Sequence, residues 1–158
     1  MIEKKELNPQ QAKEKALRLL EFRSHSEKEL CDKLLRAGAK REDIPPIMSF
    51  LKEYGFINDA EYAKRLARDL QNLKKFGRRR IVQELKMKGI SSEDAENALD
   101  ALEGDEEDAL MPLMERKLGG NFEKKSIDRA IRYFAYRGYA FDDIKACIER
   151  LKADAFED

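Results

Sequence analysis

Three glycines, Gly38, Gly89 and Gly138, anchor a pattern of apolar residues that occurs three times along the 158-residue chain. The glycines lie 51 and then 49 residues apart. Apolar residues stand four and eight positions before each glycine and six, nine and thirteen positions after it, and an acid directly precedes the sixth position. Such a repeat constrains the fold strongly, because every copy is expected to form the same supersecondary unit. The matched triplets are Leu30, Ile81 and Ala130; Leu34, Leu85 and Phe134; Asp43, Asp94 and Asp143; Ile44, Ala95 and Ile144; Ile47, Ala98 and Cys147; and Leu51, Leu102 and Leu151.

The spacing within each copy is typical of α-helices. Residues four apart lie on one face of a helix. A glycine one turn after the last apolar residue favours a helix end, because glycine adopts the left-handed conformation at little cost. The acid then falls in the first turn of the next helix, where a negative charge suits the helix dipole. Each glycine is therefore expected to join two helices, and a third helix precedes them.

Helix-start signals agree with this interpretation. They are the capping-box pairs Ser26 with Glu29 and Asn58 with Glu61, a cap at Ser91 or Ser92, and Pro45 with Pro46 in a first helical turn. Ser26, Gly77 and Ser126 all stand twelve residues before an anchor glycine, so we expect the middle helices to start at equivalent points. The predicted helices lie near residues 10–23, 26–37, 42–54, 59–74, 78–88, 92–103, 106–118, 124–137 and 141–153.

The predicted fold class is all-α, with three tandem three-helix repeats that form an elongated, curved array. We expect an N-terminal tail over residues 1–11, repeats over residues 12–57, 58–104 and 105–153, and a C-terminal tail over residues 154–158. The alternative is a compact bundle with coincidental spacing, which the number of matched positions disfavours. Pro112 conflicts with a regular seventh helix, so that helix either starts only just before Pro112 or is kinked there.

Charge is distributed unevenly along the chain. The 32 basic residues balance the 32 acidic ones, so net charge alone indicates no partner. Residues 58–90, however, hold 10 basic and 4 acidic side chains, whereas residues 91–110 hold 9 acidic and no basic ones. The second repeat is therefore basic and is followed by an acidic joint.

The basic charge peaks at Lys74, Lys75, Arg78, Arg79 and Arg80. Most charge runs are solvated surface. Three arginines in the first turn of the predicted fifth helix nevertheless oppose the helix dipole. A cluster placed against that preference favours an external anion as its partner.

A second candidate surface lies on the predicted eighth helix. Arg129, Tyr133 and Tyr136 fall at helical spacing, with Arg132 beside them. Arginine interleaved with tyrosine is able to contact phosphates and to stack on bases or protein surfaces. Tyrosines in such places are more often half-buried packing residues, and from sequence we favour that interpretation.

Other polar groups do not indicate a catalytic, cofactor-binding or metal-binding site, and we predict none. The consecutive acids over residues 105–108 would diverge around a helix and would not converge on one ion. His25, the only histidine, directly precedes the Ser26 cap, where a structural role is natural. The sequence contains no phosphate-binding glycine loop and no dinucleotide fingerprint.

Cys31 and Cys147 are interpreted as small buried or half-buried residues in a reducing cytoplasm. No apolar run approaches the roughly 18 residues of a membrane span, and residues 1–11 lack the apolar stretch of a signal peptide. We therefore expect a cytoplasmic location without membrane contact.

Three further groups of residues carry a family resemblance. They are Arg23, Ser24, His25, Ser26, Glu29, Leu30, Leu34 and Gly38; Gly55, Phe56, Ile57, Asn58, Asp59, Tyr62 and Ala63; and Phe76, Gly77, Ile81, Glu84, Leu85, Lys88, Gly89 and Ile90. In these segments the chain resembles the RecX family, bacterial regulators of the RecA recombinase, and the three-helix repeat resembles the fold of that family. The resemblance extends from about Ala16 to Leu151. The third repeat matches less well and keeps mainly Arg137, Gly138, Tyr139, Asp143 and Ile144.

The resemblance implies a regulator that binds the RecA–DNA filament along its helical groove and inhibits filament extension, ATP hydrolysis and strand exchange in DNA repair, recombination and the SOS response. It implies no enzymatic activity and no cofactor. We expect a monomer whose partner is the RecA filament, with single-stranded DNA as a second candidate partner. The alternative function is nucleic-acid binding by the basic second repeat without RecA, and the third, an enzyme, lacks a convergent set of residues. The candidate contacts are Lys74, Lys75, Arg78, Arg79, Arg80, Arg129, Arg132, Tyr133 and Tyr136.

Overall fold

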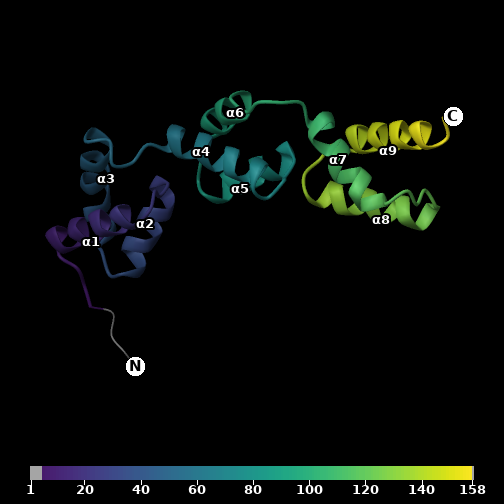
Figure 1. The fold of residues 1–158 in the computed structure, drawn as a ribbon. Helices are drawn as coiled ribbons and strands as arrows, with labels where there is room; N and C mark the ends of the chain where they lie inside the picture. Colours follow the sequence, from purple (N-terminus) through teal and green to yellow (C-terminus); the bar gives the residue numbers. More distant parts are fainter. Residues whose placement is uncertain (1–4, 158) are drawn as a thin grey trace. The chain divides into compact units, whose positions relative to one another are not determined.

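The computed structural model describes residues 5–157, which form nine α-helices and one short 3-10 helix and contain no β-strand (Figure 1). The elements are α1 Pro9–Phe22, α2 Glu27–Arg36, η1 Arg41–Asp43, α3 Ile44–Glu53, α4 Asp59–Asn72, α5 Arg78–Met87, α6 Ser92–Asp100, α7 Glu106–Leu118, α8 Lys124–Tyr136 and α9 Phe141–Ala155. The nine predicted helices are therefore confirmed. Their ends differ from the predicted ones by three residues or fewer.

The predicted helix starts are confirmed at most positions. Ser26 forms a capping box with Glu29 at the start of α2. Asn58 Oδ1 accepts a hydrogen bond from the amide of Glu61, and Ser91 Oγ accepts one from the amide of Asp94. Each cap satisfies an amide that has no partner within its own helix.

The middle helices differ in one respect from the prediction. Ser26 and Gly77 directly precede α2 and α5, but α8 begins at Lys124, so Ser126 lies inside its first turn. The residue before α8, Glu123, makes no side-chain cap. The equivalence of the three helix starts was therefore wrong for the third repeat.

The anchor glycines have the expected conformation. Gly38, Gly89 and Gly138 have φ of 109°, 79° and 98°, in the region that side chains with a Cβ rarely adopt. Each of these glycines follows a middle helix by two residues, as a left-handed helix stop should.

Helix α7 runs through Pro112. It begins at Glu106, six residues earlier, so the first of the two alternatives for this helix was wrong. Proline at this position lacks the amide that would bond to the carbonyl of Asp108. The helix nevertheless continues to Leu118 and ends at Gly119, which is left-handed.

The chain folds into two compact units. Unit 1 contains the residues up to Leu66 together with Leu85–Ala98, and unit 2 contains Ala67–Glu84 together with the residues from Leu99 on. Helices α4, α5 and α6 of the second repeat thus contribute residues to both units.

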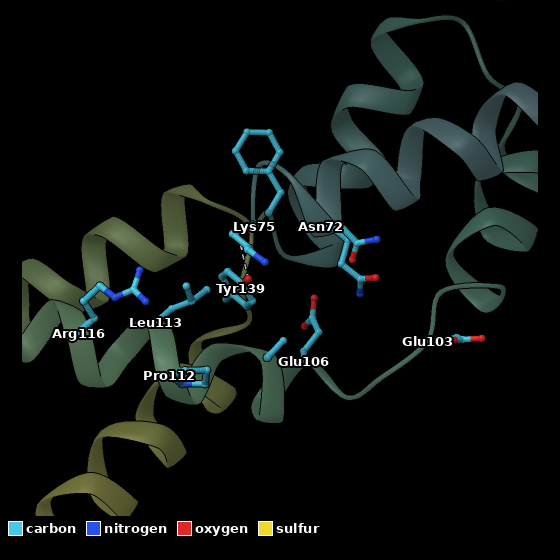
Figure 2. A pocket seen from close by; sticks show the side chains of 11 residues that line it. Asn72, Lys75, Glu103, Glu106, Pro112, Leu113, Arg116 and Tyr139 are labelled. Atoms are coloured by element: carbon cyan, nitrogen blue, oxygen red, sulfur yellow. Dashed lines mark hydrogen bonds between the residues drawn. The ribbon is translucent and has the colours of Figure 1, made fainter.

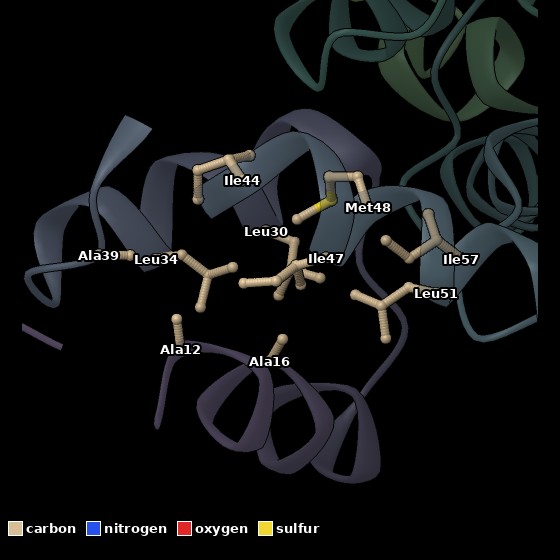
Figure 3. Close-up of a cluster of buried hydrophobic side chains, with 10 residues drawn as sticks. All are labelled: Ala12, Ala16, Leu30, Leu34, Ala39, Ile44, Ile47, Met48, Leu51 and Ile57. Carbon is tan, nitrogen blue, oxygen red and sulfur yellow. The ribbon is translucent and has the colours of Figure 1, made fainter. Parts of the chain in front are cut away.

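The core of unit 1 lies between α1, α2 and α3. Ala12 and Ala16 of α1 are fully buried and point toward larger side chains of α2 and α3 (Figure 3). Small residues on this face let α1 approach its neighbours closely, so the core is filled from one side by leucine and isoleucine. Leu7, from the segment before α1, also packs against this core.

The core of unit 2 is formed mainly by α7, α8 and α9, which pack against one another. Leu110, Met114 and Leu118 repeat every four residues along α7 and are buried. Phe134 of α8 and Cys147 of α9 meet them in the same cluster. The prediction that the two cysteines are buried or half-buried is confirmed, because Cys147 is buried and Cys31 is partly buried.

Within residues 5–157, every helix is too short or too polar to cross a lipid bilayer.

Candidate interaction surface

In unit 1, the loop before α2 contacts the loop after α5, and we call this contact the first junction (Arg23–Glu29 with Lys88 and Gly89). Ser26 Oγ donates a hydrogen bond of 2.6 Å to the carbonyl of Lys88. Gly89 lies so close to the Lys28 side chain that a Cβ at position 89 would overlap it. The start of α2, the middle helix of the first repeat, is thereby hydrogen-bonded to the end of α5, the middle helix of the second.

A carboxylate neutralises the cations of the first junction. Glu29 accepts hydrogen bonds from Arg23 at 2.9 Å and from Tyr62 at 2.7 Å, and its carboxylate lies 3.4 Å from Lys88 Nζ. Burial acts to raise the pKa of Glu29, but the hydrogen bonds from Arg23, Tyr62 and the Ser26 amide outweigh burial and hold this pKa at about 2. Glu29 is therefore ionised at neutral pH and links α2 and α4 with the residues that directly follow α1 and α5.

His25 serves the same junction and is buried. Its Nδ1 lies 2.9 Å from the carbonyl of Arg23, and its Nε2 lies 2.7 Å from Lys33 Nζ. Burial lowers the pKa of His25, so the neutral ring donates at one nitrogen and accepts at the other. The structural role that the sequence suggested for His25 agrees with these contacts.

In unit 2, the loop between α4 and α5 contacts the loop between α8 and α9, and we call this contact the second junction (Lys74–Arg80 with Arg137–Tyr139). The amide of Gly77 donates to the carbonyl of Arg137 at 2.8 Å, and the amide of Arg79 donates to the carbonyl of Gly138 at 3.2 Å. Arg137 donates to the carbonyl of Lys74. Two segments about 60 residues apart in sequence thus form one surface.

Tyr139 fixes the centre of the second junction. Its hydroxyl donates to the carbonyl of Lys75 at 2.8 Å (Figure 2), and burial raises the pKa of Tyr139 to about 12. Lys75 has φ of 58°, the one left-handed residue other than glycine among residues 5–157. A strained backbone of this kind persists only where neighbouring contacts hold it.

The two junctions use equivalent positions of the repeat. Ser26 corresponds to Gly77, and Lys88 corresponds to Arg137, when the copies are aligned on their anchor glycines. Glu29 corresponds to Arg80 in the same alignment. The second junction therefore has a cation at the place where the first junction has its carboxylate.

Arg78 contacts other parts of unit 2 rather than open solvent. Its amide donates to the carboxylate of Glu106 in the first turn of α7, and its Nη2 lies 3.4 Å from the carbonyl of Gly104. An acid of the same chain thus meets the start of α5. The binding of an external anion by the arginine side chains of this cluster stays a prediction.

Arg80 is held by three side chains. Its Nε donates to Glu84 at 2.9 Å, and its guanidinium lies 4.7 Å from the ring centre of Phe76 and 5.1 Å from that of Tyr136. This contact joins the predicted basic cluster to the predicted arginine–tyrosine surface of α8. The two candidate surfaces are therefore continuous in unit 2.

The contacts of Arg80 continue into a longer row of alternating rings and cations. The Arg137 guanidinium lies 5.1 Å from the ring centre of Phe76 and 5.4 Å from that of Tyr133, and Lys117 Nζ lies 4.2 Å from the latter. We call this row the basic ladder. Its members, in order, are Tyr136, Arg80, Phe76, Arg137, Tyr133 and Lys117.

Tyr133 and Tyr136 are more exposed than the favoured sequence interpretation supposed. Tyr136 has 76% of its surface exposed, so its interpretation as a packing residue was wrong. Tyr133 is 41% exposed and packs its ring edge-to-face against Phe134. The core-facing side of α8 is as predicted, because Ala130 and Phe134 are buried.

The remaining candidate contacts are also exposed: Lys74, Lys75, Arg79, Arg129 and Arg132. A hollow of about 420 Å³ lies beside the second junction. Lys75, Glu106, Pro112 and Tyr139 are among the residues that line it (Figure 2). Two acids, Glu103 and Glu106, and two bases, Lys75 and Arg116, line this hollow, so it carries no single sign of charge.

Five residues of this surface were not predicted as contacts from the sequence: Phe76, Glu106, Lys117, Arg137 and Tyr139. Phe76 stands within the basic peak and in the family resemblance, Arg137 only in the resemblance, and Glu106 only in the acidic run. Arg137 stands at the repeat position of Lys88, but this equivalence identifies a contact only once the structure has shown that Ser26 bonds to Lys88. Within residues 5–157, His, Cys, Asp and Glu side chains form no group of three or more that could hold a metal ion.

Two protein-family models match most of the first two repeats. The first three-helix domain of RecX matches residues 12–51, and the second three-helix domain of RecX matches residues 58–99. The regulatory protein RecX of Vibrio vulnificus (strain CMCP6) is 34% identical over 135 residues, which cover 84% of this chain and 88% of the relative. The regulatory protein RecX of Vibrio parahaemolyticus serotype O3:K6 (strain RIMD 2210633) is 33% identical over 146 residues, which cover 91% of this chain and 94% of the relative.

Solved structures support the same fold. The crystal structure of RecX from Lactobacillus salivarius superposes with a TM-score of 0.81 at 23% identity and covers 92% of this chain and 97% of that chain. A crystal structure of a regulatory protein RecX has a TM-score of 0.77 at 19% identity and covers 94% of this chain and 81% of that chain.

Proposed function

This chain belongs to the RecX family, and on that premise we propose that it binds the RecA–DNA filament and inhibits filament extension, ATP hydrolysis and strand exchange. It acts by binding, as a monomer in the cytoplasm, and performs no chemistry of its own. Its relatives carry the name of regulatory proteins, which agrees with this proposal.

The observation that supports the proposal best is the continuous basic surface of unit 2. Arg80 connects the cluster at the start of α5 with the arginines and tyrosines of α8. Filaments of protein and DNA offer phosphates and acidic side chains, and a surface of this charge complements them. Arginine and tyrosine are also the residue types that contribute most to protein interfaces.

The mechanism that we propose is steric. Three tandem repeats offer several contact surfaces on one chain, so that individually weak contacts add through a high effective concentration. A chain bound in this way would obstruct the addition of RecA subunits and the movements that accompany ATP hydrolysis.

The test is a RecA ATPase and strand-exchange assay with the full chain added. We expect the wild-type chain to inhibit both activities. Arg79→Glu combined with Arg132→Glu should weaken inhibition about tenfold or more, because both side chains are exposed and charge reversal adds repulsion. A change that included Arg80 would also break its ion pair with Glu84, so it is a less specific test.

The matched control is Arg18→Glu combined with Arg41→Glu. These arginines are equally exposed but lie in unit 1, so inhibition should be retained. A wild-type chain without effect on RecA would refute the proposed function. Equal losses in the two double variants would show instead that unit 2 has no special part in it.

Nucleic-acid binding without RecA is a second candidate function. The observation that favours it is the alternation of rings and cations in the basic ladder, which is typical of single-strand binding. Tight, strongly salt-dependent binding of single-stranded DNA in the absence of RecA would favour this function.

A further inference from the structure

One lysine of unit 1 lies against the buried histidine. Lys33 Nζ, on α2, lies 2.7 Å from His25 Nε2. The other ring nitrogen of His25 lies 2.9 Å from the carbonyl of Arg23, so that nitrogen carries the proton of the neutral ring. His25 Nε2 therefore presents a lone pair to Lys33 and can take up a proton from it.

Lys33 has no carboxylate partner, in contrast to the lysines of the first junction. Lys28 Nζ lies 3.6 Å from Asp32, and Lys88 Nζ lies 3.4 Å from Glu29. No carboxylate of residues 5–157 lies within ion-pair distance of Lys33. A carboxylate would stabilise the ammonium form of a lysine, whereas Lys33 meets an imidazole that stabilises it less.

Most of the charges that face Lys33 are positive. Partial burial lowers the pKa of Lys33, and Arg23, Arg36 and Lys88 lower it further, while Glu29 opposes them. A larger share of Lys33 is therefore in the neutral, nucleophilic form than in an isolated lysine. Its side chain is partly exposed, so a small reagent can reach the amine.

The surroundings of Lys33 favour an anionic reagent. Arg36 follows Lys33 by three residues on α2, so the two side chains are neighbours on the helix surface. Arg36 is exposed and forms no ion pair with a carboxylate in the described part of the chain, and its Nε bonds to the carbonyl of Asp32 at 3.3 Å. A guanidinium of this kind binds phosphate oxygens well. An electrophile that carries a phosphate directly on its reactive carbon is an acyl phosphate.

We propose that Lys33 is a site of acylation by acyl phosphates, in which Arg36 binds the phosphate and His25 accepts the proton. The Lys33 nitrogen forms a bond to the acyl carbon, the bond between that carbon and the phosphate oxygen breaks, and phosphate leaves with the electron pair. His25 Nε2 takes the proton that the nitrogen loses and passes it through water to the phosphate, which balances the charges. The product is an N-acyl lysine whose amide still has an N–H for His25. This site goes beyond the proposed function and does not rest on it.

The experiment incubates the full chain with acetyl phosphate at neutral pH and follows acetylation of each lysine by mass spectrometry of proteolytic peptides. Lys33 should react about tenfold faster than Lys28, because a positioned base assists the amine. Lys28 is the matched internal control, since it lies on the same helix, pairs with Asp32 and has 56% of its side chain exposed. Exposure alone would favour Lys28 over Lys33.

Variants test the two neighbouring groups separately. Arg36→Gln should slow the reaction of Lys33 with acetyl phosphate about threefold and leave its reaction with uncharged acetic anhydride unchanged. Arg41→Gln, at another exposed arginine of unit 1, is the control and should change neither rate. His25→Gln keeps a hydrogen-bond acceptor but takes up no proton, so the preference for Lys33 over Lys28 should be lost. His25 is buried, so a thermal melt should accompany that variant.

The outcomes decide the proposal without RecA in the reaction. Acetylation of Lys33 no faster than that of Lys28 would overturn the site. An unchanged rate in Arg36→Gln, or faster labelling of Lys33 by acetyl-CoA than by acetyl phosphate at equal concentration, would overturn the assignment of an acyl phosphate. A preference for Lys33 that falls in Arg36→Gln and in His25→Gln would support both. Failure of this site and failure of the proposed function are therefore separate results.

Discussion

Gly138 combines two requirements in one residue. Its φ of 98° lies in the left-handed region, and a Cβ there would overlap the backbone amide of Arg80. Gly119 has only the first requirement, because its φ is 55° and nothing lies within 4 Å of the place where a Cβ would stand. Alanine substitution at Gly119 and at Gly138 therefore separates the cost of backbone strain from the cost of steric overlap.

We expect Gly119→Ala to lower the free energy of unfolding by about 1 kcal/mol, the usual cost of a left-handed alanine. Gly138→Ala should cost roughly 1–3 kcal/mol more, since the second junction must open to admit the methyl group. Urea denaturation of the two variants measures the difference. Equal losses would contradict the close packing of Gly138 against α5.

Glu29 contributes to the sensitivity of unit 1 to acid. Its folded-state pKa of about 2 lies below its ordinary value of 4.5. A carboxylate with a lowered pKa stabilises the fold fully above its unfolded pKa, and this contribution is lost as the pH falls through the folded pKa. The relevant window therefore extends from about pH 4.5 down to about pH 2.

We expect Glu29→Gln to destabilise the protein by on the order of 2 kcal/mol at pH 7, because the charge that Arg23 and Lys88 face is removed. The difference between variant and wild type should shrink as the pH falls below 4.5. Denaturation curves at pH 7, 4.5 and 3 test this. A difference that stays constant over that range would show that ionisation of Glu29 does not stabilise the fold.

Among the helix caps, Ser26 has a second task. It accepts from the Glu29 amide at 3.2 Å and donates to the Lys88 carbonyl at 2.6 Å. Ser91 caps α6 through the Asp94 amide alone. Replacing either serine removes a helix cap. Replacing Ser26 also leaves the Lys88 carbonyl without its hydrogen-bond donor.

Ser91→Ala should cost about 1 kcal/mol, the typical value for a lost cap. Ser26→Ala should cost about 2–3 kcal/mol, because a buried hydrogen bond between two repeats is lost as well. Thermal unfolding of both variants provides the comparison. The junction bond would be energetically unimportant if the two shifts in Tm were the same.

The helices were predictable from sequence, and the junctions were not. Caps, apolar spacing and glycine stops act over three or four residues, so α2 and its Ser26–Glu29 box are visible in the sequence itself. The contact of Gly77 with Arg137 joins residues 60 positions apart and leaves no periodic pattern. For the same reason the acid at the start of α5 could not be found, since Glu106 belongs to another helix.

The candidate contact residues also divide into those whose exposure follows from a local pattern and those whose exposure depends on distant residues. The exposure of Arg129 and Arg132 follows from the core-facing period of α8, and the structure agrees with it. Whether a tyrosine on that face packs or projects depends on neighbours from other helices, so the sequence could not decide it for Tyr136. Phe76 is a ring whose partners, Arg80 and Arg137, are brought together only by the fold.

At the scale of the whole molecule, the buried clusters of the first and third repeats share no residue. One contains residues between Ala12 and Ile57, and the other contains residues between Leu110 and Ile148. In repeat proteins, stability is approximately a sum over local units and their interfaces. Damage to one cluster should therefore remain largely local.

We expect Leu34→Ala, at a fully buried position, to cost about 2–5 kcal/mol. Amide hydrogen exchange should accelerate in α1, α2 and α3 and change little in α7, α8 and α9. Leu110→Ala should instead accelerate amide exchange in α7, α8 and α9 and change it little in α1, α2 and α3. Equal acceleration in both sets of helices would mean that the chain opens as one cooperative unit.

The first repeat has Glu29 where the second has Arg80. This difference restricts how the chain could gain a repeat by gene duplication. A tandem duplication of the middle repeat would set Arg80 of the first copy, already paired with Glu84, against Lys88 of the second. Such a copy would need a compensating acidic substitution before it could pack as the first junction does. A duplicated middle repeat would instead have to join its copy as the second junction does, with Arg80 held by Glu84 and an aromatic ring in place of a carboxylate shared between the two repeats.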